Sequence, residues 1–254
     1  MIIVRAARLS DEVRNEIQKL MSKCCEAEKL KGAIFLDNKL NAIAEMPCFY
    51  LAYHDNTLCG LLTMFTPDLR ECEIYAYVLP ELRKKHIFTN LLSVARQTLD
   101  ARNIAKIHFV VEPESASGNA VAQKICGDME YSEYLLSYDM SCPVPHTERP
   151  ELDIEIDEEH GDDVFLMYKD ESLLGMSNIN FYHNYATIYE YEIVPDMRGK
   201  GYGSILLNEL LEYIMENEVD GIILNVNSKN EAAFKLYTKN NFIIKEQLNY
   251  YKLP

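Results

Sequence analysis

The chain has 254 residues, of which 48% are hydrophobic, and a formal net charge of −15 at pH 7. This length suits one large domain or two of ordinary size, each with a well-buried core. The strong negative charge argues against nonspecific binding to nucleic acid or to an anionic membrane surface, and it suits a cationic partner.

The seven cysteines are scattered along the chain, with Cys24 and Cys25 adjacent and no Cys-x-x-Cys pair. An odd number without a disulfide framework predicts reduced thiols in a cytoplasmic protein. The apolar run at the N-terminus, residues 1–4, is too short for a signal peptide, and no stretch approaches the about 20 apolar residues of a membrane helix. The six histidines lack metal-ligand spacing, so we expect no metal site.

In chain order, the first half begins with two predicted helices, over 10–31 and 36–45. Ser10 suits the N-cap of the first helix, whose apolar residues form one stripe. A strand over 73–79, a helix, a strand over 106–111, a short helix and a strand over 134–138 follow.

The second half follows a predicted linker over 141–150, which contains three prolines. After a short strand with alternating acidic residues, a hairpin is predicted from 164–168 and 173–177. A strand over 188–194, an amphipathic helix, a strand over 221–226, a short helix and a strand from Phe242 complete the pattern.

The two halves repeat at a constant offset of 115 residues in the sequence. The first copy of the repeated positions is Pro80, Arg83, Lys85, Leu91 and Leu92. The second copy is Pro195, Arg198, Lys200, Leu206 and Leu207. Only the first half has the opening helices. A repeat of this size indicates two homologous domains, so we predict an α/β (α+β) chain with domains 1–142 and 150–254, each a mixed sheet with helices.

The most informative stretch is the glycine-rich turn between a predicted strand and a helix, residues 194–204. Gly199, Gly201 and Gly203 alternate after Arg198, with Lys200 among them. Free N–H groups at a helix N-terminus attract phosphate, and glycine lets the backbone approach it closely. The order of the glycines matches neither a dinucleotide fingerprint nor a Walker loop, which leaves a phosphate loop of another kind or an ordinary strand–helix turn.

This turn resembles the acyl-coenzyme A pyrophosphate loop of the GNAT superfamily of N-acyltransferases, whose pattern is Arg/Gln-x-x-Gly-x-Gly/Ala. Residues 224–242 resemble the second block of the family: a strand, an Asn-x-x-Ala helix, a tyrosine and a terminal Asn/Gly-Phe. The two blocks cover about residues 150–254 in the right order. The first half matches through the internal repeat, so the whole chain resembles a tandem GNAT protein.

The resemblance implies a twisted mixed sheet that splays open between its two central strands, with coenzyme A in the cleft. Ile193 and Val194 would pair with the pantetheine arm, and Asn230 would contact it. The backbone of the loop would hold the pyrophosphate, through Arg198, Gly199, Lys200, Gly201, Tyr202, Gly203 and Ser204. Tyr237 would protonate the departing thiolate, because its pKa exceeds that of the thiol; the alternative is a core aromatic residue.

The implied reaction is direct attack of a primary amine on acetyl-coenzyme A in a ternary complex. A carboxylate or a water chain should take the proton of the amine. Glu190 and Glu192 are the candidates because they lie two residues apart on one predicted strand and hence on one face. A solvated or ion-paired strand face is the alternative for both.

The first half departs from the family pattern at the aligned positions of the glycine turn, which are Lys84, His86 and Phe88. Glu112 and Glu114 follow its second strand and would repel a phosphate. We therefore predict that this domain is a degenerate, non-catalytic copy.

For the whole chain we expect acetyl-coenzyme A as cosubstrate and no metal. The acceptor would be a small-molecule or peptide amine. The negative net charge of the chain favours an acceptor that is cationic. We expect no nucleic-acid or membrane partner, and a monomer or a homodimer. The alternative function is a non-catalytic acyl-coenzyme A-binding module or sensor.

Overall fold

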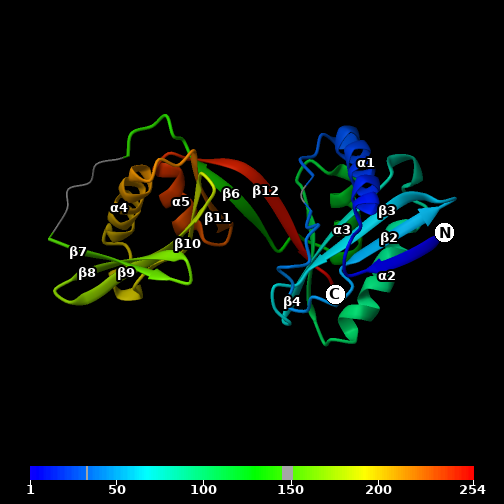
Figure 1. The fold of residues 1–254 in the computed structure, drawn as a ribbon, viewed down its shortest axis with the longest axis horizontal. Helices are drawn as coiled ribbons and strands as arrows, with labels where there is room; N and C mark the ends of the chain where they lie inside the picture. The colour runs from blue at the N-terminus through cyan, green and yellow to red at the C-terminus, as the bar shows by residue number, and fades with distance from the viewer. Residues whose placement is uncertain (33, 145–150) are drawn as a thin grey trace. The chain divides into compact units, whose positions relative to one another are not determined.

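The computed structural model describes residues 1–32, 34–144 and 151–254, so most of the predicted linker lies outside the described residues. The chain divides into two compact units (Figure 1). Unit 1 comprises Met1–Tyr131 together with Leu248–Pro254, and unit 2 comprises Ser132–Gln247. These units differ from the segments 1–142 and 150–254, because the last strand of the first half, from Ser132, belongs to unit 2 and the end of the last strand, from Leu248, belongs to unit 1.

Unit 1 is a mixed sheet with helices on both faces. Its strands lie in the order β1-β2-β3-β4-β5-β12, and β4–β5 is the parallel pair. Its elements are β1 (Ile2–Ala6), α1 (Asp11–Glu28), β2 (Phe49–His54), β3 (Thr57–Phe65), β4 (Glu71–Val78), the 3-10 turn η1 (Pro80–Leu82), α2 (Ile87–Asp100), β5 (Lys106–Val111) and α3 (Ala116–Cys126). The last strand is the end of β12 (Phe242–Lys252), which pairs with β5 from Asn249 onwards.

Both faces of the unit 1 sheet are covered. Helices α1 and α2 lie on opposite sides of it (Figure 1). Every residue of β3 from Leu58 to Met64 is buried. A strand that is apolar at successive positions needs this cover on both faces, because its side chains alternate between them.

The first predicted helix is confirmed, and the second is wrong. Ser10 caps α1 by accepting a hydrogen bond from the Val13 amide at 3.4 Å. The segment 36–45 forms turns instead of a helix. Here the Asn38 side chain donates to the Ala44 carbonyl, and the Asn41 side chain accepts from the Thr66 amide at 2.6 Å. Such side-chain bonds compete with helical backbone bonds.

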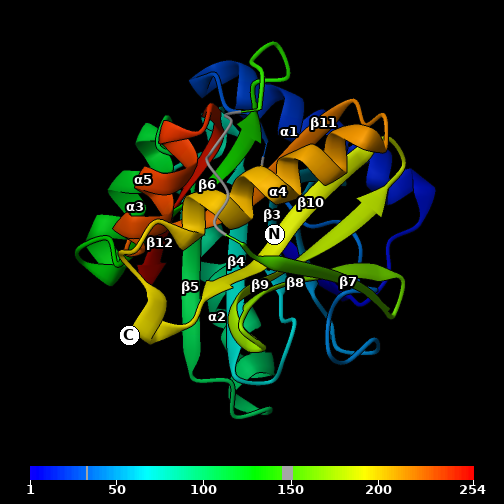
Figure 2. The same ribbon diagram turned by 90° about the vertical axis from the view of Figure 1, so that its left-hand side faces the viewer.

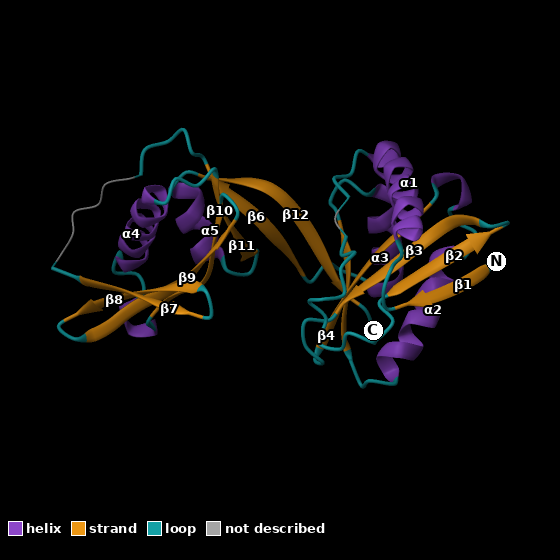
Figure 3. Cartoon of the chain, in the orientation of Figure 1, coloured by secondary structure: helices purple, strands orange, loops and turns teal. Residues whose placement is uncertain are grey.

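Unit 2 repeats the sheet without the opening helices (Figure 3). Its strands lie in the order β6-β11-β10-β9-β8-β7, and β10–β11 is the parallel pair. Its elements are β6 (Tyr131–Tyr138), β7 (Asp153–Glu159), β8 (Asp162–Lys169), β9 (Ser172–Tyr182), β10 (Tyr185–Ile193), the 3-10 turn η2 (Pro195–Met197), α4 (Tyr202–Glu216), β11 (Gly221–Asn227), α5 (Glu231–Lys239) and the start of β12.

The core of unit 2 lies under α4, which crosses the strands at an angle (Figure 2). Its buried face includes Leu206, Leu210 and Ile214, each fully buried. In β9 the buried and part-exposed residues alternate from Gly175 to Asn180, as expected for a strand with cover on one face. In the described residues, no helix has the length and apolar character needed to cross a membrane.

Candidate functional site

The two central strands of unit 2 separate partway along their length. The parallel pairing of β10 with β11 runs from Tyr185 opposite Gly221 to Ile188 opposite Leu224. Beyond this point β10 continues along β9 to Ile193, while β11 continues along β6. The edge of β10 after Ile188 therefore has no strand partner on the β11 side, which confirms the predicted splay.

A β-bulge lies at this separation. Tyr189 is opposite Asn178, whereas Glu192 is opposite Met176, so β10 has one residue more than β9 between these pairs. Glu190 adopts a left-handed backbone with a φ of 50°. Such a conformation is unfavourable for a non-glycine residue, and bulges of this kind are frequent beside active sites.

Unit 1 has no such bulge in β4. Its pairing with β3 runs without a shift from Glu73 to Val78. The number of residues between the start of the parallel pair and the proline after the strand differs between the two units. The pair starts at Glu71 in β4 and at Tyr185 in β10, which are 114 residues apart, whereas Pro80 and Pro195 are 115 residues apart. The additional residue of unit 2 is the bulge.

The glycine loop presents free backbone donors in front of α4. Gly199 and Gly201 have φ values of 74° and 92°, which favour glycine. Within the described part of the chain, the N–H groups of residues 199–203 have no acceptor. Amides that point outward at a helix N-terminus suit an anion such as a pyrophosphate.

Arg198 lies at the mouth of this loop. Its Nε donates to the Ile193 carbonyl at 2.8 Å, and its guanidinium pairs with Glu192 at 3.1 Å. Both side chains of this pair are 59% exposed, so a ligand anion can reach the guanidinium. Val194 is held by its amide, which donates to the Leu174 carbonyl at 2.9 Å.

Tyr237 lies near the loop but is held in an apolar environment. It is 5% exposed, and its ring packs edge-on against Tyr191 with the centroids 5.9 Å apart. Burial raises its pKa, so the phenol keeps its proton at neutral pH. In the described residues its hydroxyl has no hydrogen-bond partner, which leaves it available as a donor to a ligand.

Tyr191 connects the bulge to α4 and was not among the predicted site residues. Its hydroxyl donates to the Gly203 carbonyl in the first turn of the helix. This contact fixes the start of α4 against β10. The one-residue difference in strand length between the two halves was the sequence signal that would have pointed to this region.

The two predicted carboxylates lie on the same face of the sheet, next to each other along β10. Glu190 accepts a hydrogen bond from Asn178 at 2.8 Å, and Glu192 lies opposite Met176. Since Asn178 and Met176 are two residues apart on β9, they share a face. Asn230, predicted to contact the cofactor, caps α5 by accepting from the Ala233 amide at 3.2 Å.

The loop of unit 1 follows the same backbone course without glycine. Lys84 and His86 have φ values of 63° and 62°, close to those of Gly199 and Gly201. The Phe88 ring packs against Phe109, with centroids 5.1 Å apart. The conformation is therefore retained at positions where side chains make it unfavourable.

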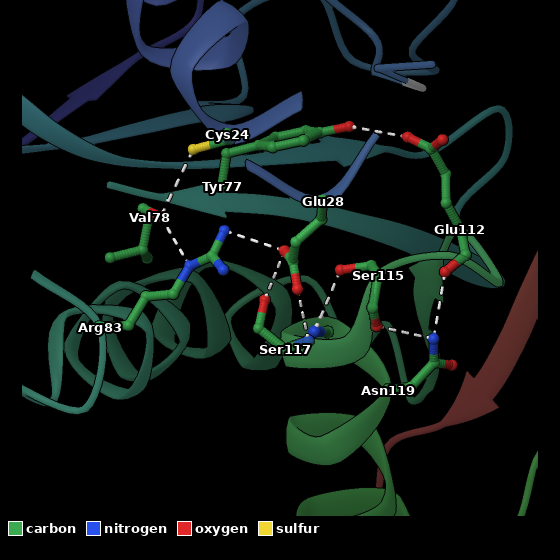
Figure 4. Close-up of polar contacts among 10 residues, drawn as sticks. Cys24, Glu28, Tyr77, Val78, Arg83, Glu112, Ser115, Ser117 and Asn119 are labelled. Carbon is green, nitrogen blue, oxygen red and sulfur yellow. Dashed lines mark hydrogen bonds and ion pairs between the residues drawn. The ribbon is translucent and has the colours of Figure 1, made fainter. Parts of the chain in front are cut away.

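The arginine of the unit 1 loop is already paired within its own unit (Figure 4). Arg83 donates through Nε to the Val78 carbonyl, as Arg198 does to Ile193, but its guanidinium pairs with Glu28 of α1 at 2.9 Å. Glu28 also accepts from the amide and the hydroxyl of Ser117, at the start of α3. A carboxylate of the chain thus occupies this helix N-terminus.

The segment after α1 bonds to Glu112 at the splay of unit 1, beside a cavity that is lined by Tyr75, Tyr77 and Val111 among others. Glu112 is buried and accepts from the amides of Lys31 and Gly32 at 2.7 and 2.9 Å. It also accepts from the Tyr77 hydroxyl at 3.4 Å (Figure 4). These internal contacts support the prediction that unit 1 is a degenerate copy. Within the described residues, no group of three or more His, Cys, Asp and Glu side chains is placed to hold a metal ion.

Comparison with known proteins identifies one family over both halves. The family model described as the acetyltransferase (GNAT) family matches residues 14–127 and again residues 131–242. Streptothricin acetyltransferase A of Bacillus subtilis is 33% identical over 98 residues, which are 38% of this chain and 57% of that protein. Acetyltransferase PseH of Campylobacter jejuni is 33% identical over 84 residues, 33% of this chain and 52% of that protein. The chain therefore spans about half the length of these curated relatives.

Solved structures share the fold over the full length. A GCN5-related N-acetyltransferase from Sphaerobacter thermophilus has a TM-score of 0.75 at 13% identity, covering 99% of this chain and 96% of that one. A tandem GNAT protein from the clavulanic acid biosynthesis pathway has a TM-score of 0.63 at 14% identity, covering 99% and 97%. At these identities the likeness concerns the fold alone.

Proposed function

The chain belongs to the acetyltransferase (GNAT) family, and from this premise we propose that unit 2 transfers an acetyl group from acetyl-coenzyme A to a primary amine. The observation that carries the proposal is the glycine loop with its free amides, which only unit 2 combines with a bulged strand and a buried tyrosine. Unit 1 would not turn over, because its loop arginine and its splay are engaged by its own side chains.

The residues of the loop fit a pyrophosphate. The amides of residues 199–203 would donate to its oxygens, the glycines leave their approach unobstructed, and Arg198 and Lys200 supply positive charge. The edge of β10 at Ile193 and Val194 would lie along the pantetheine arm. The bound thioester would supply the acetyl group, and the protein would supply the general acid and the base.

Tyr237 is the proposed general acid. Its phenol is neutral at physiological pH, and its hydroxyl has no competing partner within the described residues. The phenol would donate its proton to the sulfur as the carbon–sulfur bond of the thioester breaks, and the phenolate left behind would regain a proton from solvent.

Glu190 is the better of the two candidate bases. Glu192 is paired with the Arg198 guanidinium at 3.1 Å, so its oxygens are already engaged. Glu190 accepts only a neutral amide hydrogen bond, from Asn178. We therefore assign the proton of the attacking amine to Glu190, directly or through one water molecule.

We also propose a cytoplasmic location for the protein. The seven cysteines are all free thiols in the structure, which supports a reducing, cytoplasmic compartment. A sedimentation measurement distinguishes the two proposed states of the chain, a monomer and a homodimer.

The test is thiol release from acetyl-coenzyme A with a panel of primary amines. Amine-dependent release that is lost in Gly201→Trp and reduced in Tyr237→Phe is the expected result. Unchanged turnover in both variants would contradict the site. Tight acetyl-coenzyme A binding without transfer to any amine would favour the alternative, a binding module or sensor.

A further inference from the structure

Tyr191 of β10 lies between the two parts of the proposed site in unit 2, the glycine loop and Tyr237. Its hydroxyl donates to the Gly203 carbonyl in the first turn of α4. Its ring packs edge-on against the ring of Tyr237, with the centroids 5.9 Å apart and the planes at 73°. One side chain therefore contacts both the start of the helix that would hold the pyrophosphate and the proposed general acid.

The hydroxyl of Tyr191 is bonded to the backbone of α4 at two points. It donates to the Gly203 carbonyl, and the Leu207 amide also bonds to its oxygen. In a regular α-helix the amide of residue 207 donates to the carbonyl of residue 203, so the hydroxyl engages both partners of one helical bond. Burial raises the pKa of Tyr191, so the phenol keeps the proton that it donates. The Tyr191 ring is thus held at a fixed point of the helix.

The Tyr237 ring, in contrast, is held by packing alone. In the described residues its hydroxyl has no hydrogen-bond partner. Its ring neighbours are Tyr191 and Phe242, with centroids 5.9 and 5.6 Å away. Phe242 has no polar group and packs in turn on Tyr138. Of these two neighbours, Tyr191 is the one that a hydrogen bond fixes, so the direction of the Tyr237 hydroxyl depends on it.

The internal repeat shows that the two tyrosines of unit 2 occur together. The residues of unit 1 that lie 115 positions before Tyr191, Gly203 and Tyr237 are Ala76, Phe88 and Ala122. The order large, small, large is replaced by small, large, small. In unit 1 the large residue, Phe88, packs on Phe109, and Ala122 is fully buried. Unit 1 therefore lacks both the proposed acid and its neighbour, as expected if the second tyrosine serves the first.

We propose that Tyr191 is a positioning residue, which sets the direction of the Tyr237 hydroxyl relative to the glycine loop and so places the acid at the sulfur of acetyl-coenzyme A. The inference rests on the proposed function, because it concerns how the general acid of that reaction is aligned. In this role Tyr191 acts through Tyr237 and exchanges no proton with the reactants. A residue that only joined α4 to β10 would affect stability and cofactor affinity, whichever side chain stood at position 237.

The first test is a double-mutant cycle on kcat for amine-dependent thiol release. Tyr191→Phe keeps the ring and removes the hydroxyl that bonds to Gly203. Because one buried hydrogen bond is lost, kcat should fall about fivefold, with KM for acetyl-coenzyme A within about twofold of wild type. In the Tyr237→Phe background the same substitution should leave kcat unchanged, because no hydroxyl remains to be aligned.

Tyr213→Phe is the matched control. It also removes a phenol hydroxyl that is bonded within unit 2, to Asp163 at 2.7 Å, and the Tyr213 ring packs on Phe165. Its effect on kcat should be below about twofold and the same in both backgrounds.

Tyr191→Leu is a second variant at the positioning residue, which removes the ring edge as well as the hydroxyl. It should lower kcat more than Tyr191→Phe does, and again only when Tyr237 is present. Melting temperatures show that each variant is folded.

A second measurement follows the Tyr237 hydroxyl without any transfer. Tyrosines labelled with carbon-13 at Cζ each give an NMR signal, and the signal of Tyr237 is the one missing from Tyr237→Phe. Acetyl-coenzyme A, added without an amine, should shift this signal in the wild type and in Tyr213→Phe. In Tyr191→Phe the shift should be smaller, although calorimetry should find an affinity for acetyl-coenzyme A within about twofold of wild type.

Three results would overturn the inference: a kcat of Tyr191→Phe equal to that of wild type, a fall by the same factor in both backgrounds, or a Tyr237 signal that responds alike in wild type and Tyr191→Phe. Failure of the proposed function is distinguishable from these. If no amine is acetylated, but Tyr191→Phe and not Tyr213→Phe suppresses the response of Tyr237 to acetyl-coenzyme A, the positioning role stands and the transferase assignment falls.

Discussion

Arg83 and Glu28 form an ion pair of 2.9 Å in unit 1, with side chains only 24% and 12% exposed. The equivalent Arg198 of unit 2 pairs with Glu192 at 3.1 Å, where both side chains are 59% exposed. The two arginines make the same backbone hydrogen bond, so they are placed alike and differ in their partners. The charge of Arg83 is therefore neutralised within unit 1, whereas Arg198 remains accessible to a ligand.

The first prediction concerns stability. Glu28→Gln should lower the free energy of unfolding by about 2–4 kcal/mol, because it leaves the mostly buried Arg83 without its charge partner. Glu192→Gln should change it by less than about 0.5 kcal/mol, because an exposed pair contributes little. Urea denaturation compares the two variants, and equal losses would refute this account of Arg83.

The second prediction concerns the glycine loop. No atom lies within 4 Å of a Cβ added at Gly201, so Gly201→Ala is disfavoured by its φ of 92° rather than by contact. Adjusting the loop at a cost of about 1–2 kcal/mol should weaken acetyl-coenzyme A binding about tenfold. His86→Gly, at the equivalent position of unit 1, serves as the control and should leave the affinity unchanged in calorimetry.

The third prediction concerns Tyr237. Tyr237→Phe keeps the ring packing against Tyr191 and removes the hydroxyl, so kcat should fall about 100-fold while KM for acetyl-coenzyme A stays within about twofold. Tyr213→Phe, in the same unit, is the control. A kcat equal to wild type would mean that water protonates the thiolate.

Burial of Tyr237 also has a consequence for alkaline stability. Its pKa is raised in the folded state, so its contribution to stability is complete below the unfolded pKa of about 10 and is lost as the pH rises above that value. The wild type should therefore lose more stability than Tyr237→Phe between pH 9 and pH 11, as measured by urea denaturation at each pH.

The sequence predicted the tandem arrangement, most strands and the glycine loop, because hydrophobic periodicity and turn residues are local signals. It did not predict the exchange of the last strands, since nothing local distinguishes which sheet β6 and β12 join. The helix expected over 36–45 failed because the Asn38 and Asn41 side chains replace backbone bonds. Arg83 and Glu28 are 55 residues apart in the sequence, and no sequence motif predicts that they form an ion pair.

The fourth prediction assigns the base. Glu190→Gln should reduce kcat about 10- to 100-fold, because an amide cannot take up the proton of the attacking amine. Glu192→Gln should act mainly on KM for acetyl-coenzyme A, because it releases Arg198 from its ion pair. Glu190→Gly separates chemistry from conformation: it relieves the left-handed backbone at this position and should raise stability while it lowers kcat. If kcat falls in Glu192→Gln and not in Glu190→Gln, the catalytic base is Glu192.

The last prediction tests the strand exchange. Leu253 follows β12, is 3% exposed in the core of unit 1, and its amide donates to the Ile107 carbonyl at 2.9 Å. Leu253→Ala should destabilise unit 1 by about 2–4 kcal/mol, the usual cost of a cavity in a core. Ile243→Ala, near the start of the same strand and 45% exposed, should cost less than about 1 kcal/mol. Hydrogen exchange locates the effect: in Leu253→Ala the amides of β5 should lose protection and those of β11 should keep it. Loss of protection in β11 alone would mean that the end of the chain belongs to the sheet of its own half.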